Sequence, residues 1–178
     1  MARLPDVSWD DLTLEQQALW PDGRMIAPYR VLMNVPEIGE THFRLSRTLR
    51  GATNFPAQLQ ELATLTTARE QNCQYVWAAH NRIARDAGTR PEALDAVSDG
   101  MSLTGLTDDE ALVVGYTQKL IGPKQVSDAT FQSALSRFGQ RGVLELTHIV
   151  AYYLMMCAVN NAFEVSPEDD GMQRLLPE

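Results

Sequence analysis

The sequence predicts an all-α protein, and three observations indicate this fold class. Threonine or asparagine residues stand repeatedly at positions that are typical of helix N-termini. The Asp-Gly pairs that begin at Asp22, Asp99 and Asp170 never lie between two alternating apolar runs, so none is typical of a β-hairpin. A length of 178 residues, of which 44% are hydrophobic, suits one compact helical domain.

Charge and composition exclude several classes of partner. The formal net charge is −8, which leaves a nucleic-acid backbone or an anionic membrane surface little to bind. The N-terminus lacks a basic region followed by an apolar run, and the longest apolar segment, 149–159, is shorter than the ~20 residues of a membrane-spanning helix. Cys73 and Cys157 are therefore expected as free thiols in a cytoplasmic protein.

The N-terminal part is expected to be an extension, residues 1–30, in front of the main helical domain, residues 31–165. Its sequence Thr13-Leu-Glu-Gln16 places a hydroxyl at a helix start and an amide three residues later, which is a capping box. The extension is therefore expected to be loose apart from one short helix near 13–20.

Proline and capping signals mark the helix starts of the main domain. Asn34 precedes Val35-Pro36 and Asn54 precedes Phe55-Pro56, and proline fits the first turn of a helix. Further capping boxes begin at Thr89 and Thr107. Together with the glycines that commonly end helices, these signals predict helices at 36–50, 56–70, 73–87, 91–99, 107–121, 127–138 and 140–164.

The C-terminal segment, residues 166–178, is expected to be an extended tail. Leu175 and Leu176 either dock on a neighbouring subunit or fray with the rest of the tail. The acidic run Glu168-Asp169-Asp170 is expected to be solvated.

The segment from Glu61 to His80 holds the candidate chemistry. At about 100° per helical residue, Cys73 and His80 lie about 20° apart around the axis, with Trp77 on the same face. Asn72 is a good N-cap, which would put Cys73 in the first helical turn, where the helix dipole favours a thiolate. Glu61 lies on the preceding helix and could orient His80 or exchange protons with it if the two helices pair.

The same residues also have structural interpretations. A single cysteine on a helix is commonly a small buried hydrophobe, and Tyr75 and Trp77 commonly pack in a core. One cysteine and one histidine leave a metal-ligand shell incomplete, so no metal site is expected. His148 either faces a pocket with Tyr152 or is a satisfied core or interface histidine, which we favour, and His42 is expected at the surface.

The spacing of Glu61, Cys73 and His80 resembles the motif of carboxymuconolactone decarboxylase-like proteins and of the related alkyl hydroperoxidase D. The resemblance covers roughly residues 30–165 and also rests on Ala68-Arg69, the pattern Tyr75-x-Trp77-x-x-His80, and a late helix with Tyr152, Tyr153 and Asn160-Asn161. It implies an alkyl hydroperoxidase D-like helical bundle, a homo-oligomer that is a trimer or a hexamer, and no cofactor.

Position 76 departs from both branches of this group. The peroxidase branch has a second cysteine there, which completes a Cys-x-x-Cys pair, and the decarboxylase-like branch commonly has glutamate, whereas this chain has Val76. Cys73 therefore lacks the neighbouring thiol that would resolve a sulfenic acid. Cys157 lies in an apolar run with Met155 and Met156, which is typical of a buried structural thiol.

Three functions follow from these residues and the resemblance. The first is a cofactor-independent enzyme that acts on a small carboxylate or lactone by proton transfer, with or without loss of carbon dioxide. His80 would be its general acid and base, Glu61 the partner of His80, and Cys73 a polarising neighbour. The expected binding residues are Tyr75, Val76 and Trp77. The alternatives are a peroxide reductase that uses Cys73 with an external thiol, and a non-catalytic oligomer that binds small molecules.

Overall fold

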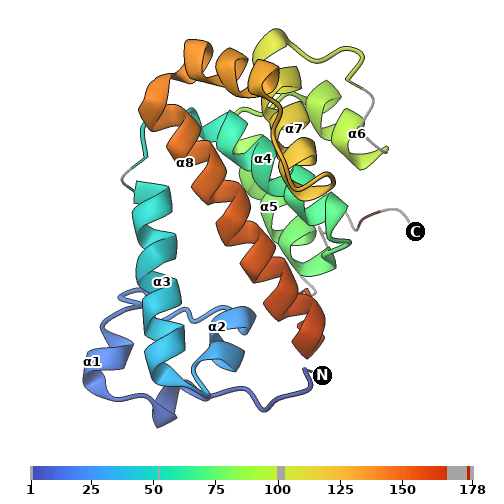
Figure 1. The fold of residues 1–178 in the computed structure, drawn as a ribbon. Coiled ribbons are helices and arrows are strands. Elements are labelled where there is room, and N and C mark those ends of the chain that lie inside the picture. The colour runs from blue at the N-terminus through green and yellow to red at the C-terminus, as the bar shows by residue number, and fades with distance from the viewer. Residues whose placement is uncertain (1, 52, 100–102, 168–175, 177–178) are drawn as a thin grey trace.

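Helices make up all the regular secondary structure of the residues described in the computed structural model, which are 2–51, 53–99, 103–167 and 176. The predicted all-α class is confirmed (Figure 1). In chain order the elements are a 3-10 turn η1 (Trp9–Asp11), α1 (Leu14–Gln17), α2 (Ala27–Leu32), α3 (Pro36–Gly51), α4 (Ala57–Glu70), α5 (Gln74–Asp86), α6 (Pro91–Ser98), α7 (Asp108–Ile121) and α8 (Asp128–Phe163).

Helix α4 is the centre of the bundle and packs against α5, α6, α7 and α8. Every residue from Leu59 to Ala68 is buried, so the helix has no solvent face over this stretch. Its buried Thr64, Thr66 and Thr67 donate their hydroxyl hydrogens to carbonyls one turn earlier, which satisfies them within the helix. Glu61 lies in this stretch, and the fold therefore carries its carboxylate into the interior.

Helix α8 consists of two helical segments that meet at Gly139. This residue has φ 69° and ψ 175°, a conformation that is essentially restricted to glycine. The predicted division into helices at 127–138 and 140–164 is therefore confirmed. Contrary to the expectation from sequence, α8 is long and apolar enough to cross a membrane, alone among the described helices, although half of its most apolar window is buried within the fold, as a core helix would be.

The N-terminal extension is packed, and the predicted looseness is wrong. Its apolar residues form a second hydrophobic cluster with the start of the main domain, made of Leu12, Trp20, Met25, Tyr29, Leu32 and Met33. Helix α2, which no capping signal in the sequence predicted, contacts both α3 and α8. Gly39 permits this close approach, because a β-carbon there would lie 2.6 Å from the sulfur of Met33.

The helix starts follow the predicted capping signals in part. The capping boxes at Thr13 and Thr107 are present. Thr89 instead donates its hydroxyl hydrogen to the carbonyl of Gln58, and α6 begins at Pro91 without a side-chain cap. The side chain of Asn34 does not cap α3, because its amide group donates to the carbonyls of Pro5 and Val31.

One described residue of the C-terminal tail packs against its own chain. Leu176 is buried in the main core, and its backbone N–H donates to Oε1 of Gln74 at 2.9 Å. Within the subunit, Leu176 thus already has a docking place near the start of α5. Leu175 and the acidic run at 168–170 lie outside the described residues.

Candidate functional site

Glu61 and His80 form a buried pair between α4 and α5. Oε2 of Glu61 lies 2.6 Å from Nδ1 of His80, and the two residues are 7% and 5% exposed. The predicted contact between these side chains is therefore confirmed. Because Nδ1 is held by the carboxylate, Nε2 is the ring nitrogen left for a ligand, and the tautomer with hydrogen on Nδ1 is the one this contact favours.

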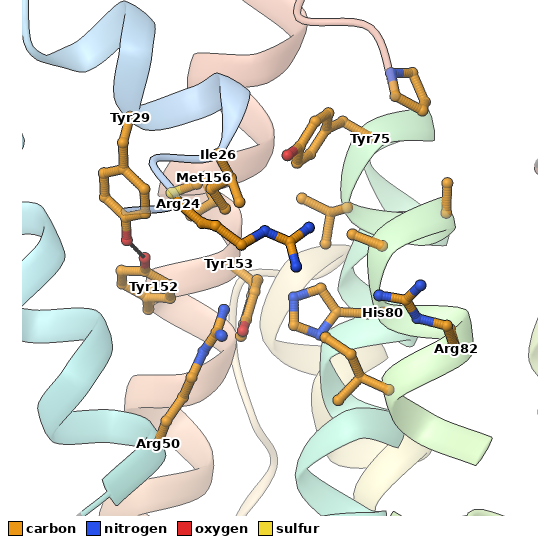
Figure 2. Close-up of a pocket in the computed structure, with 15 residues that line it drawn as sticks. Arg24, Ile26, Tyr29, Arg50, Tyr75, His80, Arg82, Tyr152, Tyr153 and Met156 are labelled. Carbon is orange, nitrogen blue, oxygen red and sulfur yellow. Dashed lines mark hydrogen bonds between the residues drawn. The ribbon is translucent and has the colours of Figure 1, made fainter. Parts of the chain in front are cut away.

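His80 lies in the wall of a pocket of about 390 Å³ (Figure 2). Helices α2, α3, α5 and α8 and the loop before α2 contribute its walls. The lining residues that bear on its chemistry are Arg24, Tyr29, Arg50, Tyr75, Tyr152 and Tyr153. Val76, the residue that departs from both branches of the family motif, also lines this pocket. An aliphatic side chain therefore stands where the family has a thiol or a carboxylate.

Tyr153 places a phenol beside the imidazole of His80. The two ring centroids are 4.8 Å apart in an edge-on arrangement. Burial, with the nearby charge of Glu61, raises the pKa of Tyr153 to about 12, although a hydrogen bond from Arg50 opposes the rise. The hydroxyl therefore keeps its hydrogen near neutral pH and is able to donate it to a ligand.

Arginine side chains give the pocket a positive character in an acidic protein. Figure 2 shows the guanidinium groups of Arg24 and Arg50 directed toward the space beside His80. Arg50 is engaged with Tyr153, whereas the Arg24 guanidinium has no side-chain partner among the residues described. Such groups favour a ligand that carries a carboxylate. Sequence reasoning missed both, because they lie outside the motif and only the fold brings them to His80.

His42 is buried, and its predicted place at the surface is wrong. It is 6% exposed and packs edge-on against Tyr29 and Tyr152. The hydroxyls of these two tyrosines are 3.1 Å apart and form one wall of the pocket. The face of α3 that carries His42 is turned toward α2 and α8, and burial there lowers the pKa of the imidazole.

Cys73 does not line the pocket, so the predicted common cavity with His80 is not found. The residue is fully buried and is itself the N-cap of α5, with extended backbone angles (φ −96°, ψ 95°), while Asn72 is left-handed (φ 46°). Since Cys73 is not in helical conformation, the angular arithmetic that placed it on the stripe of His80 does not apply. Trp77 is likewise fully buried outside the pocket, and Tyr75 and Val76 line it.

The environment of Cys73 nevertheless favours its thiolate. Its pKa is lowered first by a hydrogen bond from the thiol of Cys157, and further by the backbone N–H groups of Val76 and Tyr75 at the start of α5, while burial opposes these effects. The pKa of Cys157 is raised first by the hydrogen bond that its thiol donates to Cys73, and further by burial and by the charge of Cys73. Cys157 is buried, as predicted, but it is also in contact with Cys73.

The remaining candidates lie elsewhere. His148 is exposed on α8, and its ring contacts the carbonyl of Leu144 at 2.9 Å on its own helix, outside the pocket. Among the described residues, no group of three or more histidine, cysteine, aspartate or glutamate side chains could hold a metal ion. The chemistry of the pocket is therefore that of His80, Glu61 and the tyrosines and arginines around them.

Residues 36–119 match the carboxymuconolactone decarboxylase family. The matched segment is a little under half of the chain, and over it the sequence is similar to this family. The matched segment includes Glu61, Cys73 and His80 and excludes Arg24 and Tyr153, which other parts of the chain add to the pocket. No curated protein matches the sequence.

Solved structures with an alkyl hydroperoxidase D-like fold superpose on nearly the whole chain. An uncharacterized peroxidase-related protein with an alkylhydroperoxidase AhpD core, from Ralstonia eutropha JMP134, is 17% identical with a TM-score of 0.78, over 95% of this chain and 93% of that one. An uncharacterized peroxidase-related protein from Silicibacter sp. TM1040 is 15% identical, with a TM-score of 0.80 and the same coverage. The debrominase Bmp8 is 14% identical, with a TM-score of 0.74 over 94% and 91%.

Proposed function

We propose that this carboxymuconolactone decarboxylase-like protein is an enzyme that transfers a proton on a small carboxylate or lactone, using its own side chains and no cofactor. The observation that carries the proposal is the buried contact between Glu61 and His80 in the wall of an arginine-lined pocket. A histidine with one nitrogen held by a carboxylate and the other facing a cavity is a typical general acid and base.

The pocket supplies the other groups that such a reaction needs. Arg24 and Arg50 would bind the carboxylate of the substrate and hold a reactive carbon or oxygen next to Nε2 of His80. When Nε2 takes the proton, the carboxylate of Glu61 stabilises the imidazolium that forms. The protonated hydroxyl of Tyr153 would donate a hydrogen bond to the oxyanion that develops. The same imidazolium would return the proton in an isomerisation, or protonate the carbanion that loss of carbon dioxide leaves.

The shape of the pocket favours a small, flat, cyclic ligand. Four tyrosines line it, namely Tyr29, Tyr75, Tyr152 and Tyr153, and planar rings pack well against planar rings. A cysteine-to-alanine variant of the structurally similar debrominase Bmp8 is known in complex with 2,3,4-tribromopyrrole, a flat five-membered ring. This neighbour supports a compact aromatic or lactone ring as the ligand class, and the arginines here favour one that bears a carboxylate.

The test is proton exchange on a panel of small cyclic carboxylates and lactones in deuterated water, followed by NMR. The wild-type protein is expected to incorporate deuterium into, or release carbon dioxide from, at least one compound of the panel. His80→Ala should abolish this activity, and Glu61→Gln should lower it by about 10²–10⁴-fold, since general acid and base catalysis contributes on that scale. Unchanged exchange in His80→Ala would contradict the proposal. Ligand-induced thermal stabilisation without exchange would favour a non-catalytic binding protein.

A second candidate, a thiol-dependent peroxide reductase, is favoured by the lowered pKa of Cys73. Against it stand the complete burial of this thiol and its absence from the pocket wall. Consumption of hydrogen peroxide in the presence of dithiothreitol distinguishes the two functions. Under the first proposal, Cys73→Ser retains most of the proton-transfer activity, whereas under the second it abolishes peroxide turnover.

A further inference from the structure

The two cysteines of the chain meet in the main hydrophobic core, although 84 positions separate them in the sequence. Both are fully buried in the same hydrophobic core, and the thiol of Cys157 donates a hydrogen bond to the sulfur of Cys73. Cys73 stands at the start of α5 and Cys157 on α8, and these two helices pack together. The structure thus provides the neighbouring thiol that Val76 fails to provide.

A second contact fixes the two backbones near this pair. Nδ2 of Asn161, one turn after Cys157, donates to the carbonyl of Gln71, two residues before Cys73, at 2.8 Å. The chain then passes through the left-handed Asn72, and the N–H of Cys73 donates to the carbonyl of Ala68 at 2.8 Å. The turn that carries Cys73 is therefore tied both to α4 and to α8, and this holds the two sulfur atoms together.

We infer that Cys73 and Cys157 form a redox pair, which closes to an intramolecular disulfide between α5 and α8 when a small hydroperoxide oxidises the protein. This inference does not rest on the proposed proton transfer, because neither sulfur lies in the pocket wall. It adds to the protein an oxidation site that the Cys-x-x-Cys pattern of the family does not describe.

The chemistry balances with the hydroperoxide as the only oxidant. The thiolate of Cys73 attacks the terminal oxygen of the hydroperoxide, the O–O bond breaks, an alcohol leaves and Cys73 becomes a sulfenic acid. The sulfur of Cys157 then attacks the sulfur of Cys73, the S–S bond forms and the S–O bond breaks, and water leaves with the proton of Cys157. Two electrons pass from the two thiols to the peroxide. The lowered pKa of Cys73 suits its role as the thiol that attacks the peroxide.

Sequence neighbours of both cysteines line the pocket. Tyr75 and Val76, which line the pocket, follow Cys73 by two and three residues, and the lining residue Met156 immediately precedes Cys157. Both cysteines are fully buried, so an oxidant must be small to reach them from the pocket. Hydrogen peroxide, which is close in size to water, is therefore a better probe than a bulky organic hydroperoxide.

The experiment treats the full chain with hydrogen peroxide, unfolds it in the presence of N-ethylmaleimide and measures the intact mass. The expected product carries no maleimide, has lost two hydrogens and is a monomeric chain on a non-reducing gel. Peptide mapping should find the Cys73–Cys157 cross-link, and dithiothreitol should restore both thiols. Cys157→Ser should instead stop at a sulfenic or sulfinic acid on Cys73.

Val76→Cys serves as the positive control for the strength of the oxidant, because it creates a Cys-x-x-Cys pair that begins at Cys73. Retention of both alkylatable thiols in the wild-type chain, at a peroxide concentration that oxidises this variant, would overturn the inference. Overoxidation of Cys73 while Cys157 stays free would also overturn it. Circular dichroism of each variant checks that the helical fold is intact. If Cys157→Ser is unfolded, Cys157→Ala takes its place in the comparison of masses.

Discussion

Tyr153 is a residue of the site whose raised pKa also affects the stability of the fold. Its hydroxyl receives a hydrogen bond from Arg50, its ring stands against His80, and burial raises its pKa from 10.0 to about 12. In the unfolded chain the phenol ionises near its ordinary pKa. The folded state therefore holds a proton that the unfolded state has lost at any pH between these two values.

From this difference we predict a loss of stability in alkali. The contribution of Tyr153 is fully present below pH 10 and is lost as the pH rises toward 12, with a slope of about 1.4 kcal/mol per pH unit. In Tyr153→Phe the free energy of unfolding should fall less steeply with pH over this interval. The two slopes should differ by about 1.4 kcal/mol per pH unit. Urea unfolding at closely spaced pH values measures both slopes. Equal slopes in the two proteins would contradict the assignment.

The contribution of His42 to stability depends on pH in the opposite direction to that of Tyr153, because burial lowers the pKa of His42. A lowered folded pKa means that the unfolded chain binds the proton first, so the contribution of His42 is present above about pH 6.5 and declines as the solution is acidified. Its Nε2 is buried without a hydrogen-bond partner among the described residues.

We therefore predict that His42→Phe raises the melting temperature, and raises it more at pH 5 than at pH 8. Phenylalanine would retain the edge-on contacts with Tyr29 and Tyr152 and would remove the buried imidazole nitrogen. Differential scanning calorimetry at the two pH values measures the effect. A variant that is less stable than the wild type at both pH values would show that the imidazole is needed in the cluster.

At the scale of the helices, Gly139 provides the bend that divides α8. A β-carbon there would meet no atom within 4 Å, so the cost of a substitution is the cost of the backbone conformation alone. We predict that Gly139→Ala destabilises the protein by about 1–3 kcal/mol.

Gly115→Ala is the matched control for this prediction. Gly115 lies inside α7, a β-carbon there also meets no atom within 4 Å, and alanine is the better helix former. This change should stabilise the protein by roughly 0.5–1 kcal/mol. Thermal unfolding of both variants gives the comparison. A Gly139→Ala variant as stable as the wild type would contradict the prediction, because it would mean that the bend in α8 does not need glycine.

The helices were largely predictable from the sequence because their signals are local. The capping boxes at Thr13 and Thr107 and the break at Gly139 need only neighbouring residues to act. Where a distant partner competed, the prediction failed: Thr89 bonds Gln58 across the fold, and α2 is stabilised by packing rather than by any cap.

The site divides in the same way. Glu61 and His80 could be paired from the sequence, because two consecutive helices carry them and the family motif joins them. Arg24 and Arg50 reach the pocket from a loop and from the end of α3, so no sequence spacing relates them to His80. The contact of Cys73 with Cys157 depends on how α5 meets α8, which a pattern of residues does not specify.

In the molecule as a whole, the C-terminal segment of α8 has an exposed face that carries apolar side chains around His148. Leu144 and Met155 are 60% and 42% exposed, and the exposed Ala151 and Ala158 share their side of the helix. We propose that this face is buried between subunits of a homo-oligomer, a trimer or a hexamer, in keeping with the family resemblance.

Light scattering at micromolar concentration tests this proposal. Leu144→Glu should reduce the oligomer toward a monomer while the circular dichroism spectrum stays helical, because a charge in an apolar interface is costly. Leu14→Glu, at an 86% exposed position on α1, is the matched control and should leave the mass unchanged. A monomeric wild-type protein would contradict the proposal.

The N-terminal extension and the main domain together make the pocket, since Arg24 and Tyr29 come from residues 1–30 and His80 and Tyr153 from the rest of the chain. We propose that this shared cavity binds a small carboxylate against the Glu61–His80 pair. The most direct measurement is a crystal structure of the protein soaked with a panel of small cyclic carboxylates. We predict density for one of them with its carboxylate on Arg24 or Arg50 and a ring atom within hydrogen-bonding reach of Nε2 of His80. A compound bound elsewhere while this cavity holds only solvent would contradict this binding mode.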